Sequence, residues 1–557
     1  MKITCDMLLI AALAGCTARA QRPAVRFANV PAVTIVDDRR DVPDKPEVRR
    51  FLHGLYHYSG VFQRRMTRAL ELPRQQRARG VNALDEVPSS TWFTNRIGVR
   101  DLTIDEVRAG PITSESPERH RPWTVRSTKP SGSEGGFIVT DARGVKFLLK
   151  FDGKGLPEVE TAAHVIVGKL LWACGYNVPQ DLIVYFRPAD LVLAPDAVIV
   201  DPLGDKPLDR EELDRRLADL EPTSDGRIRA LASRWLPGQE VGGHPEEGVR
   251  HDDPNDRIPH ELRRDLRGAF SIYAWLDHVD VQEGNFLDLW VEGSRDWHHH
   301  YLEHYTLDFG KALGVMAVTV PDPRRGHEYV VDFAQMSRSL LTVGLVKRPW
   351  EGRAAPNLRG VGLFESNSYD PGAWKPDFPS YLPFLTADRI DKFWGAKILM
   401  RFSRDQIHAI VETAQLSDPR AVEYLTDTLV ARQRATAFHW FSQTNPLDRF
   451  TVAPTTRGFA LCFDDLMLSY RLAPVQEATQ YVMTGYNAAN QPLGTRYVRK
   501  PDGQGHACFP LTISPAFDEY TIVELDTTRP GFFGTTYVHI ARDPTSGAPR
   551  VIGVWRS

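Results

Sequence analysis

The sequence has few cysteines and no long apolar run. Its 557 residues include five cysteines, and no two of them stand in a Cys-x-x-Cys arrangement. This absence argues against a paired-thiolate metal site. The apolar run at residues 7–14 is too short to cross a bilayer as a helix, and no other segment is long and apolar enough. No Gly-x-Ser-x-Gly sequence marks a hydrolase nucleophile.

The charge balance lacks an excess of either sign. There are 68 basic and 71 acidic residues, with a formal net charge of -3. This balance gives no general reason to expect nucleic acid or an acidic membrane surface as a partner. The length is too great for one small core and predicts two to four domains.

The first sixteen residues have the pattern of an export signal. Lys2 precedes the apolar run, which leads into Leu-Ala-Gly-Cys at residues 13–16. This motif resembles the bacterial lipobox, in which the cysteine becomes lipid-modified. We therefore expect a lipoprotein signal peptide over residues 1–16, a membrane anchor at Cys16 and a location in the bacterial envelope. The alternative is an ordinary apolar stretch with a chance cysteine, which would leave the protein in the cytoplasm.

The remaining patterns predict an α+β protein. Residues 17–45 look like a tether, and residues 48–72 have helical spacing. Three β-rich runs between residues 123 and 151 precede a helix at residues 157–173. Residues 385–445 are mainly helical, and from residue 446 onward the pattern is that of strands alone.

Two features near the start of this region suit phosphate binding. The glycine-rich stretch at residues 131–136 lies between two predicted strands, where the backbone amides of Gly132, Gly135 and Gly136 can point at phosphate. A plain hairpin turn is the alternative. Lys150 ends the next apolar strand, and Glu160 at the start of the following helix is its expected partner.

Two further motifs, each with an aspartate suited to phosphoryl transfer, follow along the chain. In the His-x-Asp-x-x-x-x-Asn motif at residues 278–285, Asp280 would orient an acceptor hydroxyl and Asn285 would hold Mg²⁺. In the Asp-Phe-Gly triplet at residues 308–310, Asp308 would hold Mg²⁺. Asp277 competes for either role of the first motif, and Glu158 is a weaker candidate than Glu160 for the partner of Lys150.

The order of these motifs resembles that of atypical kinase-like folds. These are the HipA type, the CotH type and the phosphatidylinositol-kinase-like type, together with uncharacterised bacterial lipoproteins that carry the same core. The resemblance covers residues 80–345 and implies a bilobal protein-kinase-like domain. We expect an N-terminal extension over residues 17–120, the kinase-like domain with a helical C-terminal part over 121–445, and a small β-sandwich or barrel over 446–557.

The resemblance implies an ATP- and Mg²⁺-dependent phosphotransferase. Lys150, Glu160 and Asp280 would be catalytic, Asn285 and Asp308 metal ligands, and Gly132, Gly135 and Gly136 nucleotide contacts. The expected partners are a nucleotide, an unknown hydroxyl acceptor and the membrane through Cys16, and not nucleic acid. Because an envelope compartment holds little ATP, a catalytically silent pseudokinase serving as a ligand-binding or scaffold module is the alternative.

Weaker signals lie outside these motifs. The histidines at residues 298–300, with His304 nearby, suit a transition metal, but a polar hairpin tip is the preferred interpretation. Residues 244–253 contain several residues that suit metal binding, and an exposed loop is preferred there too. Cys462 and Cys508 share the strand-rich region and are free to pair if it is oxidised.

Overall fold

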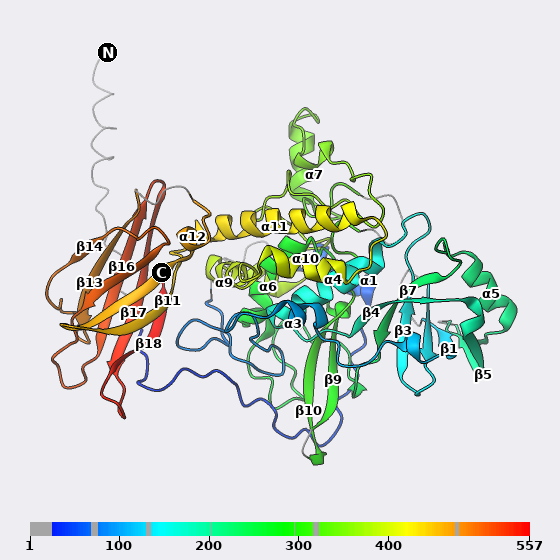
Figure 1. Cartoon of the computed structure of the whole chain (residues 1–557), viewed down its shortest axis with the longest axis horizontal. Helices are drawn as coiled ribbons and strands as arrows, with labels where there is room; N and C mark the ends of the chain where they lie inside the picture. Colours follow the sequence, from blue (N-terminus) through cyan, green and yellow to red (C-terminus); the bar gives the residue numbers. More distant parts are fainter. Residues whose placement is uncertain are drawn as a thin grey trace.

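The computed structural model describes residues 25–67, 76–129, 135–201, 203–293, 296–315, 322–473 and 478–557. The fold is α+β, as predicted. Figure 1 shows a sheet at one end, helices in the middle and a second β region at the other end. The expected leader with Cys16, and Gly132 of the glycine-rich stretch, lie outside the described residues. Among the described residues, no helix is both long and apolar enough to span a membrane.

A seven-stranded sheet follows the N-terminal extension. Its order is β4-β7-β3-β2-β1-β5-β6. The three predicted runs form an antiparallel meander, and β5, which the sequence did not reveal, adds parallel to β1. The strands are β1 (Trp123–Thr128), β2 (Gly136–Thr140), β3 (Lys146–Lys150), β4 (Asp181–Phe186), β5 (Leu191–Ile199), β6 (Lys206–Pro207) and β7 (Ile228–Arg234), with helix α5 (Arg210–Ala218) between β6 and β7.

Helix α4 (Val159–Cys174) packs on one face of this sheet and is almost entirely buried. Its Val165 joins Ile183 of β4 and Leu231 of β7 in a small apolar cluster. The helix ends at Gly175, whose φ of 133° suits glycine and where a Cβ would collide with the ring of Phe93. The predicted helix and its glycine stop are therefore confirmed.

The middle of the molecule is helical around one large core. It contains α3 (Ile104–Ala109), α6 (Arg264–Leu276), α7 (Phe333–Leu341), α8 (Leu382–Thr386), α9 (Arg389–Leu399), α10 (Arg404–Glu412) and α11 (Pro419–Phe441). Helices α6 and α9 cross where Gly268 faces Gly395, because a Cβ at either position would meet the opposite helix. A hairpin of β9 (Phe286–Gly293) and β10 (Asp296–Thr306), edged by β8 (Gln239–Glu240), extends from this core.

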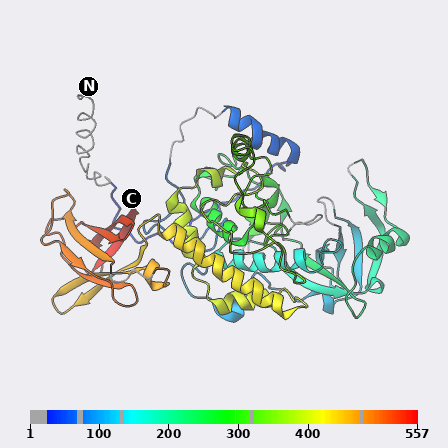
Figure 2. The same ribbon diagram turned by 90° about the horizontal axis from the view of Figure 1, so that it is seen from above.

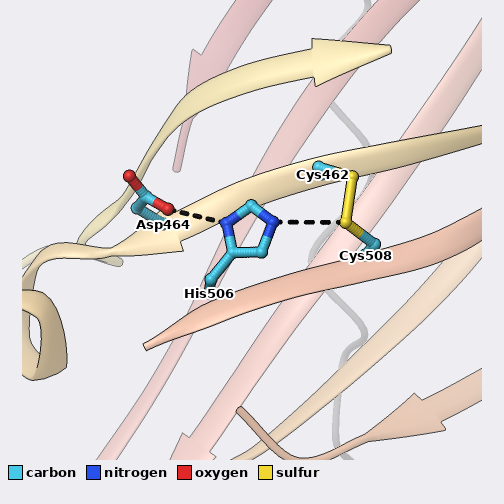
Figure 3. The surroundings of a disulfide bond; sticks show 4 residues. All are labelled: Cys462, Asp464, His506 and Cys508. Carbon is cyan, nitrogen blue, oxygen red and sulfur yellow. Dashed lines mark hydrogen bonds and ion pairs between the residues drawn. A yellow bond between two sulfur atoms is a disulfide. The ribbon is translucent and has the colours of Figure 1, made fainter. Parts of the chain in front are cut away.

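The C-terminal region consists of two sheets packed face to face, with orders β11-β12-β15 and β14-β13-β16-β17-β18. Cys462 of β12 and Cys508 of β15 are direct cross-strand partners and form a disulfide (Figure 3). The elements are β11 (Leu447–Thr455), β12 (Gly458–Asp465), α12 (Leu466–Ser469), β13 (Gln480–Asn487), β14 (Tyr497–Arg499), β15 (His506–Leu511), β16 (Thr521–Arg529), β17 (Phe532–Arg542) and β18 (Pro549–Arg556).

The N-terminal extension lies along the body of the molecule. Residues 25–45, which the sequence suggested as a tether, bond to distant parts. The amide of Val42 donates to His300 of β10 at 2.7 Å, and buried Asp38 accepts from the amide and hydroxyl of Thr91, both at 2.8 Å. Further on, α1 (His53–Tyr58), a π-helical turn (Ser59–Gln63) and α2 (Arg64–Thr67) form a short helical segment, part of the predicted one.

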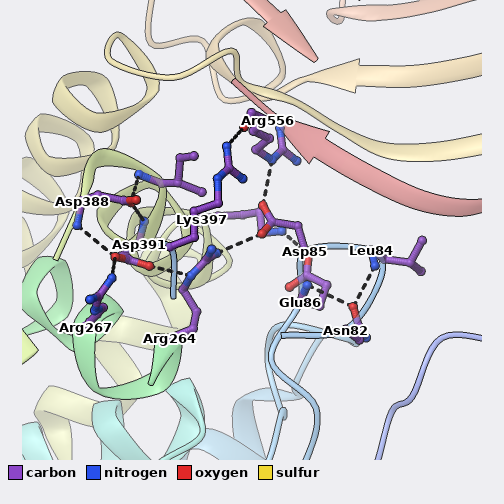
Figure 4. Close-up of polar contacts among 12 residues, drawn as sticks. Asn82, Leu84, Asp85, Glu86, Arg264, Arg267, Asp388, Asp391, Lys397 and Arg556 are labelled. Atoms are coloured by element: carbon purple, nitrogen blue, oxygen red, sulfur yellow. Dashed lines mark hydrogen bonds and ion pairs between the residues drawn. The ribbon is translucent and has the colours of Figure 1, made fainter. Parts of the chain in front are cut away.

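A buried ionic network, the junction cluster, joins the extension, the helices and the C-terminal region (Figure 4). Asp85 lies between Arg264 of α6, at 3.2 Å, and Arg556 of β18, also at 3.2 Å. Arg264 contacts Asp391 of α9 at 2.7 Å. The junction cluster consists of Asp85, Glu86, Arg264, Arg267, Asp391, Lys397, Asp448 and Arg556.

Candidate active site

Strand β3 directs Lys150 toward helix α4. Phe147 and Leu149 of β3 enter the apolar core on one face of the sheet, so the alternating Lys150 points to the other face. Lys150 pairs across the sheet with Leu231, which packs against α4. Because directly opposed residues share a face, the ammonium is held between the sheet and the helix.

The Lys150 ammonium contacts Asp308, which is distant in sequence. Its Nζ lies 2.8 Å from Oδ1 of Asp308 and 3.2 Å from Nε2 of His164. His164 in turn lies 3.4 Å from Oδ1 of Asp308 and 3.6 Å from Asp181 at the start of β4. We call Lys150, His164, Asp181 and Asp308 the site cluster.

His164 is a member of the site cluster that the sequence analysis missed. It lies one turn after Glu160 on α4, so the two side chains share a helix face. That i, i+4 spacing from the expected partner of Lys150 was the available signal. The histidine is buried, and its Nε2 lies against both members of the Lys150–Asp308 ion pair.

Glu160 does not form the ion pair that the sequence predicted. The carboxylate that contacts Lys150 in the structure is Asp308, while Glu160 is buried nearby and raises the pKa of Lys150 through its charge. Glu158, the weaker candidate, contacts Arg359 at 2.9 Å instead. The helix therefore offers Glu160 as a neighbour of the lysine, with Asp308 taking the direct contact.

The segment around Asp308 fits tightly against α4. Phe309 is fully buried, with its ring against Gly168 and near His164. Asp308 itself has a left-handed backbone conformation, with a φ of 57°. Gly310 is required for space, since a Cβ there would lie 2.8 Å from Oε1 of Glu160 and 3.0 Å from Nε2 of His164.

The loop after helix α6 brings Asp280 and Asn285 beside this segment. The side-chain amide of Asn285 donates to the Asp280 carbonyl at 2.8 Å, leaving its oxygen for a cation. The Leu307 amide donates to the carbonyl of Asn285, also at 2.8 Å, and this bond joins the loop to the residue before Asp308.

Asp280 has a cationic partner that the sequence analysis did not identify. Lys311 lies 2.8 Å from Oδ2 of Asp280, and Gln282 donates to Oδ1 at 3.2 Å. The competitor Asp277 ends α6 with a φ of 49° and accepts from the Trp374 indole at 3.0 Å. Asp277 thus stabilises the loop through this bond, and Asp280 is the better candidate for the functional aspartate.

Buried charges shift the ionisation of these groups. Burial by itself would raise the pKa of Asp308, but Lys150 and His164 outweigh it and hold that pKa well below the usual range. Burial and Lys150 would lower the pKa of His164, yet Asp181 and Asp308 raise it. Burial lowers the pKa of His278, which lies next to Phe309, to about 4. Asp308 is therefore an anion near neutral pH.

A cavity of about 860 Å³ is lined by residues that neighbour the site cluster along the chain, although none of the four cluster residues lines it. Its walls include Leu148, two residues before Lys150, and Leu307, which directly precedes Asp308. Leu287 of β9 and residues 233–236, at the end of β7 and just after it, complete a largely apolar slot of the size of a drug-like ligand, with Arg234 and Glu240 also in its walls.

The N-terminal extension forms one side of this cavity, at residues 48–52. The Arg49 amide donates to the carbonyl of Val241 at 3.1 Å, and its guanidinium contacts Glu283 at 2.8 Å. The ring of Phe51 lies against Gly284, where a Cβ would approach to 2.7 Å. The sequence carried no signal for this contact, which depends on chain packing.

Gly135, Gly136 and the histidines at residues 298–300 lie outside the site cluster. Gly136 begins β2 and pairs with Lys150, while Gly135 and Gly136 border a second cavity of about 530 Å³ with Arg229 and Arg359. The predicted hairpin is confirmed as β9 and β10, and the histidines at 298–299 fall in the irregular stretch between the Asp296–Gly293 and His300–Glu292 pairs, near the turn. His300 stacks on Trp290 with 3.8 Å between ring centres, because cross-strand neighbours of β9 and β10 share a face.

His304 belongs to a separate buried cluster, with His244 and Asp288. Nδ1 of His304 lies 2.7 Å from Asp288, and Nδ1 of His244 lies 3.5 Å from it. The guanidinium of Arg250 lies 3.4 Å from the other carboxylate oxygen and already supplies a positive charge. The expected exposed loop at residues 244–253 is therefore partly wrong, since His244 and Arg250 are buried.

Comparison with known proteins finds no matching protein-family model, no matching curated protein and no matching solved structure. The chemistry of the site therefore rests on its own geometry.

Proposed function

We propose that this protein is an atypical kinase that transfers phosphate from ATP to a hydroxyl acceptor and is held at the bacterial envelope through Cys16. The observation that carries the proposal is the 2.8 Å contact between Lys150 and Asp308, whose sequence neighbours Leu148 and Leu307 line the 860 Å³ cavity. A bilobal kinase-like fold agrees with this, because the lysine ends the third strand of its sheet and the following helix lies against it.

The residues of the site fit a Mg²⁺-nucleotide complex. Asp308 and Asn285 offer carboxylate and amide oxygens, which Mg²⁺ prefers. The side chain of Asp308 is 42% exposed whereas that of Lys150 is 8% exposed, so the carboxylate faces open space and the lysine anchors it. When bound, the complex would supply the phosphoryl group, and the apolar slot would hold its base.

Each residue then has a distinct task. Lys150 holds the phosphates in place, with Glu160 and His164 fixing its position. Asp280 accepts a hydrogen bond from the acceptor hydroxyl and orients it. Lys311 contacts Asp280 at 2.8 Å. When the acceptor binds, this ion pair must open, or the Asp280 carboxylate must contact Lys311 and the hydroxyl together. Leu148, Leu287 and Leu307 exclude water from the base.

The Lys311–Asp280 ion pair also supports the second candidate, a silent pseudokinase. A base that is permanently paired cannot accept a bond from a hydroxyl. In that case the cavity would bind a nucleotide and the protein would act as an envelope scaffold. Both candidate functions use the same binding site. They differ in whether Asp280 can separate from Lys311 and bind a hydroxyl group.

Thermal unfolding of the full chain with and without Mg-ATP tests the proposal. A ligand at a hundredfold excess over its dissociation constant adds about 2.7 kcal/mol to the free energy of unfolding. Asp308→Ala should abolish this gain, whereas the control Asp196→Asn, an exposed carboxylate of β5, should retain it. Absence of any gain in the unmodified protein would refute both candidates.

Transfer of radiolabelled phosphate to envelope extracts separates the candidates. Asp280→Ala should keep the Mg-ATP stabilisation and lose transfer if the protein is a kinase. Stabilisation without transfer, in both the parent and Lys311→Met, would leave the pseudokinase.

A further inference from the structure

Helix α7 is amphipathic with its apolar side turned outward. No residue of α7 is buried. Its polar Gln335 and Ser339, one turn apart, both bond to Arg348 of the same protein. Phe333, Met336 and Leu340, at positions i, i+3 and i+7, are exposed on the other side. In a self-contained protein the apolar stripe would face the core, so this helix is built for an apolar partner outside the chain.

The chain beyond α7 extends this apolar surface. Leu340, Leu341, Val343 and Leu345 are between 81% and 85% exposed. Figure 1 shows α7 projecting from the helical part of the molecule. Several large aliphatic side chains exposed together on one projection differ from the scattered apolar residues that ordinary surfaces carry.

The short N-terminal helical segment lies beside α7 and adds to the same surface. The rings of Phe62 and Phe333 lie 5.9 Å apart, and Figure 2 shows the segment next to α7. Leu55, Phe62 and Met66 are exposed along it at helical spacing. We call the exposed apolar side chains of residues 52–66 and 333–345 the apolar ridge.

Basic residues flank the apolar ridge along the chain, and three of them are paired: Arg49 with Glu283, Arg64 with Glu246 and Arg348 with Glu328. Residues 48–67 contain four arginines, and residues 333–350 contain two arginines and a lysine; neither stretch contains aspartate or glutamate. Arg50, Arg338 and Lys347 are exposed. This local excess contrasts with the net charge of -3 of the whole chain.

We propose that the apolar ridge docks onto the surface of an anionic lipid bilayer. Outward apolar side chains flanked by lysine and arginine are the features of helices that lie in the membrane interface. An apolar protein partner would not require the exposed basic side chains Arg50, Arg338 and Lys347, whereas anionic headgroups attract them. Docking is independent of the proposed kinase activity and of lipid on Cys16, and it would place the candidate active site close to the membrane.

A fluorescent label at the ridge tests this docking. The full chain carries Cys5→Ser and Cys16→Ser, so that no lipid is attached, and Leu345→Cys bears an environment-sensitive dye. Native Cys174 is buried and does not compete for the dye. The reference chain carries the dye at Phe517→Cys, which is fully exposed in the C-terminal region. The probe is vesicles of phosphatidylcholine with phosphatidylglycerol.

With these vesicles, emission should shift to the blue at residue 345 and stay unchanged at residue 517. Removing phosphatidylglycerol should weaken binding by more than about tenfold, because several basic side chains lose their anionic partners. Leu340→Glu with Leu341→Glu should weaken it by more than about tenfold as well, since charge resists entry into the interface. Both side chains are exposed, so the variant should fold with an unchanged melting temperature.

Three results would overturn the proposal. Equal shifts at residues 345 and 517 would indicate binding through another part of the chain. An unchanged response in the double glutamate variant would exclude the ridge. A blue shift at residue 345 that depends on protein concentration and needs no vesicles would assign the ridge to a second copy of the chain.

Discussion

The site cluster and the junction cluster are both networks of buried ionic groups, and they differ in one respect. In the junction cluster the central carboxylate, Asp391 between Arg264 and Arg267, is fully enclosed. In the site cluster, Lys150 is enclosed but the Asp308 side chain is 42% exposed. A buried ion pair alone therefore says little about function, while a buried cation holding a carboxylate against open space indicates a binding site.

The largest loss of stability is expected from a substitution that breaks the junction cluster. Asp391→Ala leaves two buried arginines without this carboxylate and should cost about 3–5 kcal/mol of unfolding free energy. Denaturant titration measures the loss. The control Asp101→Ala removes an exposed partner of Arg401 and should change stability by less than about 1 kcal/mol. Equal losses in the two variants would contradict the contrast between enclosed and exposed pairs.

The next largest effect is the pH dependence of stability that comes from buried histidines such as His278, next to Phe309. His278 has a folded pKa of about 4, below its unfolded value of about 6.5. The unfolded chain therefore binds more protons between these values, and stability should fall by roughly 3 kcal/mol as pH drops from 6.5 to 4. His244 and His539 act in the same direction.

His278→Leu should remove one of these contributions, so that the stability decreases less steeply as the pH drops from 6.5 to 4. His164, whose pKa is raised, acts oppositely, because its contribution is present at low pH and is lost as pH rises above its folded pKa. A stability profile of His278→Leu as steep as that of the parent, measured by denaturant titration at several pH values, would refute this assignment.

Gly310→Ala tests the close fit around Asp308. The new methyl group would approach Glu160 and His164, and overpacking of this kind costs about 1–3 kcal/mol. Mg-ATP stabilisation should fall as well, because the displaced groups position Lys150. Gly352→Ala, where nothing lies within 4 Å, serves as the control and should leave both quantities unchanged.

The smallest stability effect should come from Lys150→Met. The remaining Asp308 is partly exposed and keeps His164 as a neighbour, so the cost should be about 1 kcal/mol or less. Mg-ATP stabilisation should nevertheless vanish. A large loss of stability with binding intact would mean that the site cluster is structural, like the junction cluster.

Much of the α+β fold could be predicted from local patterns. The meander at residues 123–150, helix α4 with its glycine stop and the strand-rich C-terminal region all follow from residue spacing and turn residues. Strand β5 escaped prediction because its parallel pairing with β1 depends on a distant neighbour. The extension at residues 25–45 escaped for the same reason, since its stabilising bonds come from residues far along the chain.

The sequence by itself determined which groups are available for chemistry and their order along the chain: a lysine ending a strand, then an aspartate and asparagine in one loop, then Asp308 before a phenylalanine and a glycine. Only the tertiary structure decided that Asp308 takes the direct contact with Lys150, that His164 lies against both, and that α7 turns its apolar side outward. The physical reason is that spacing specifies the direction of a side chain within its own element, whereas its partner is selected by the packing of elements distant in sequence.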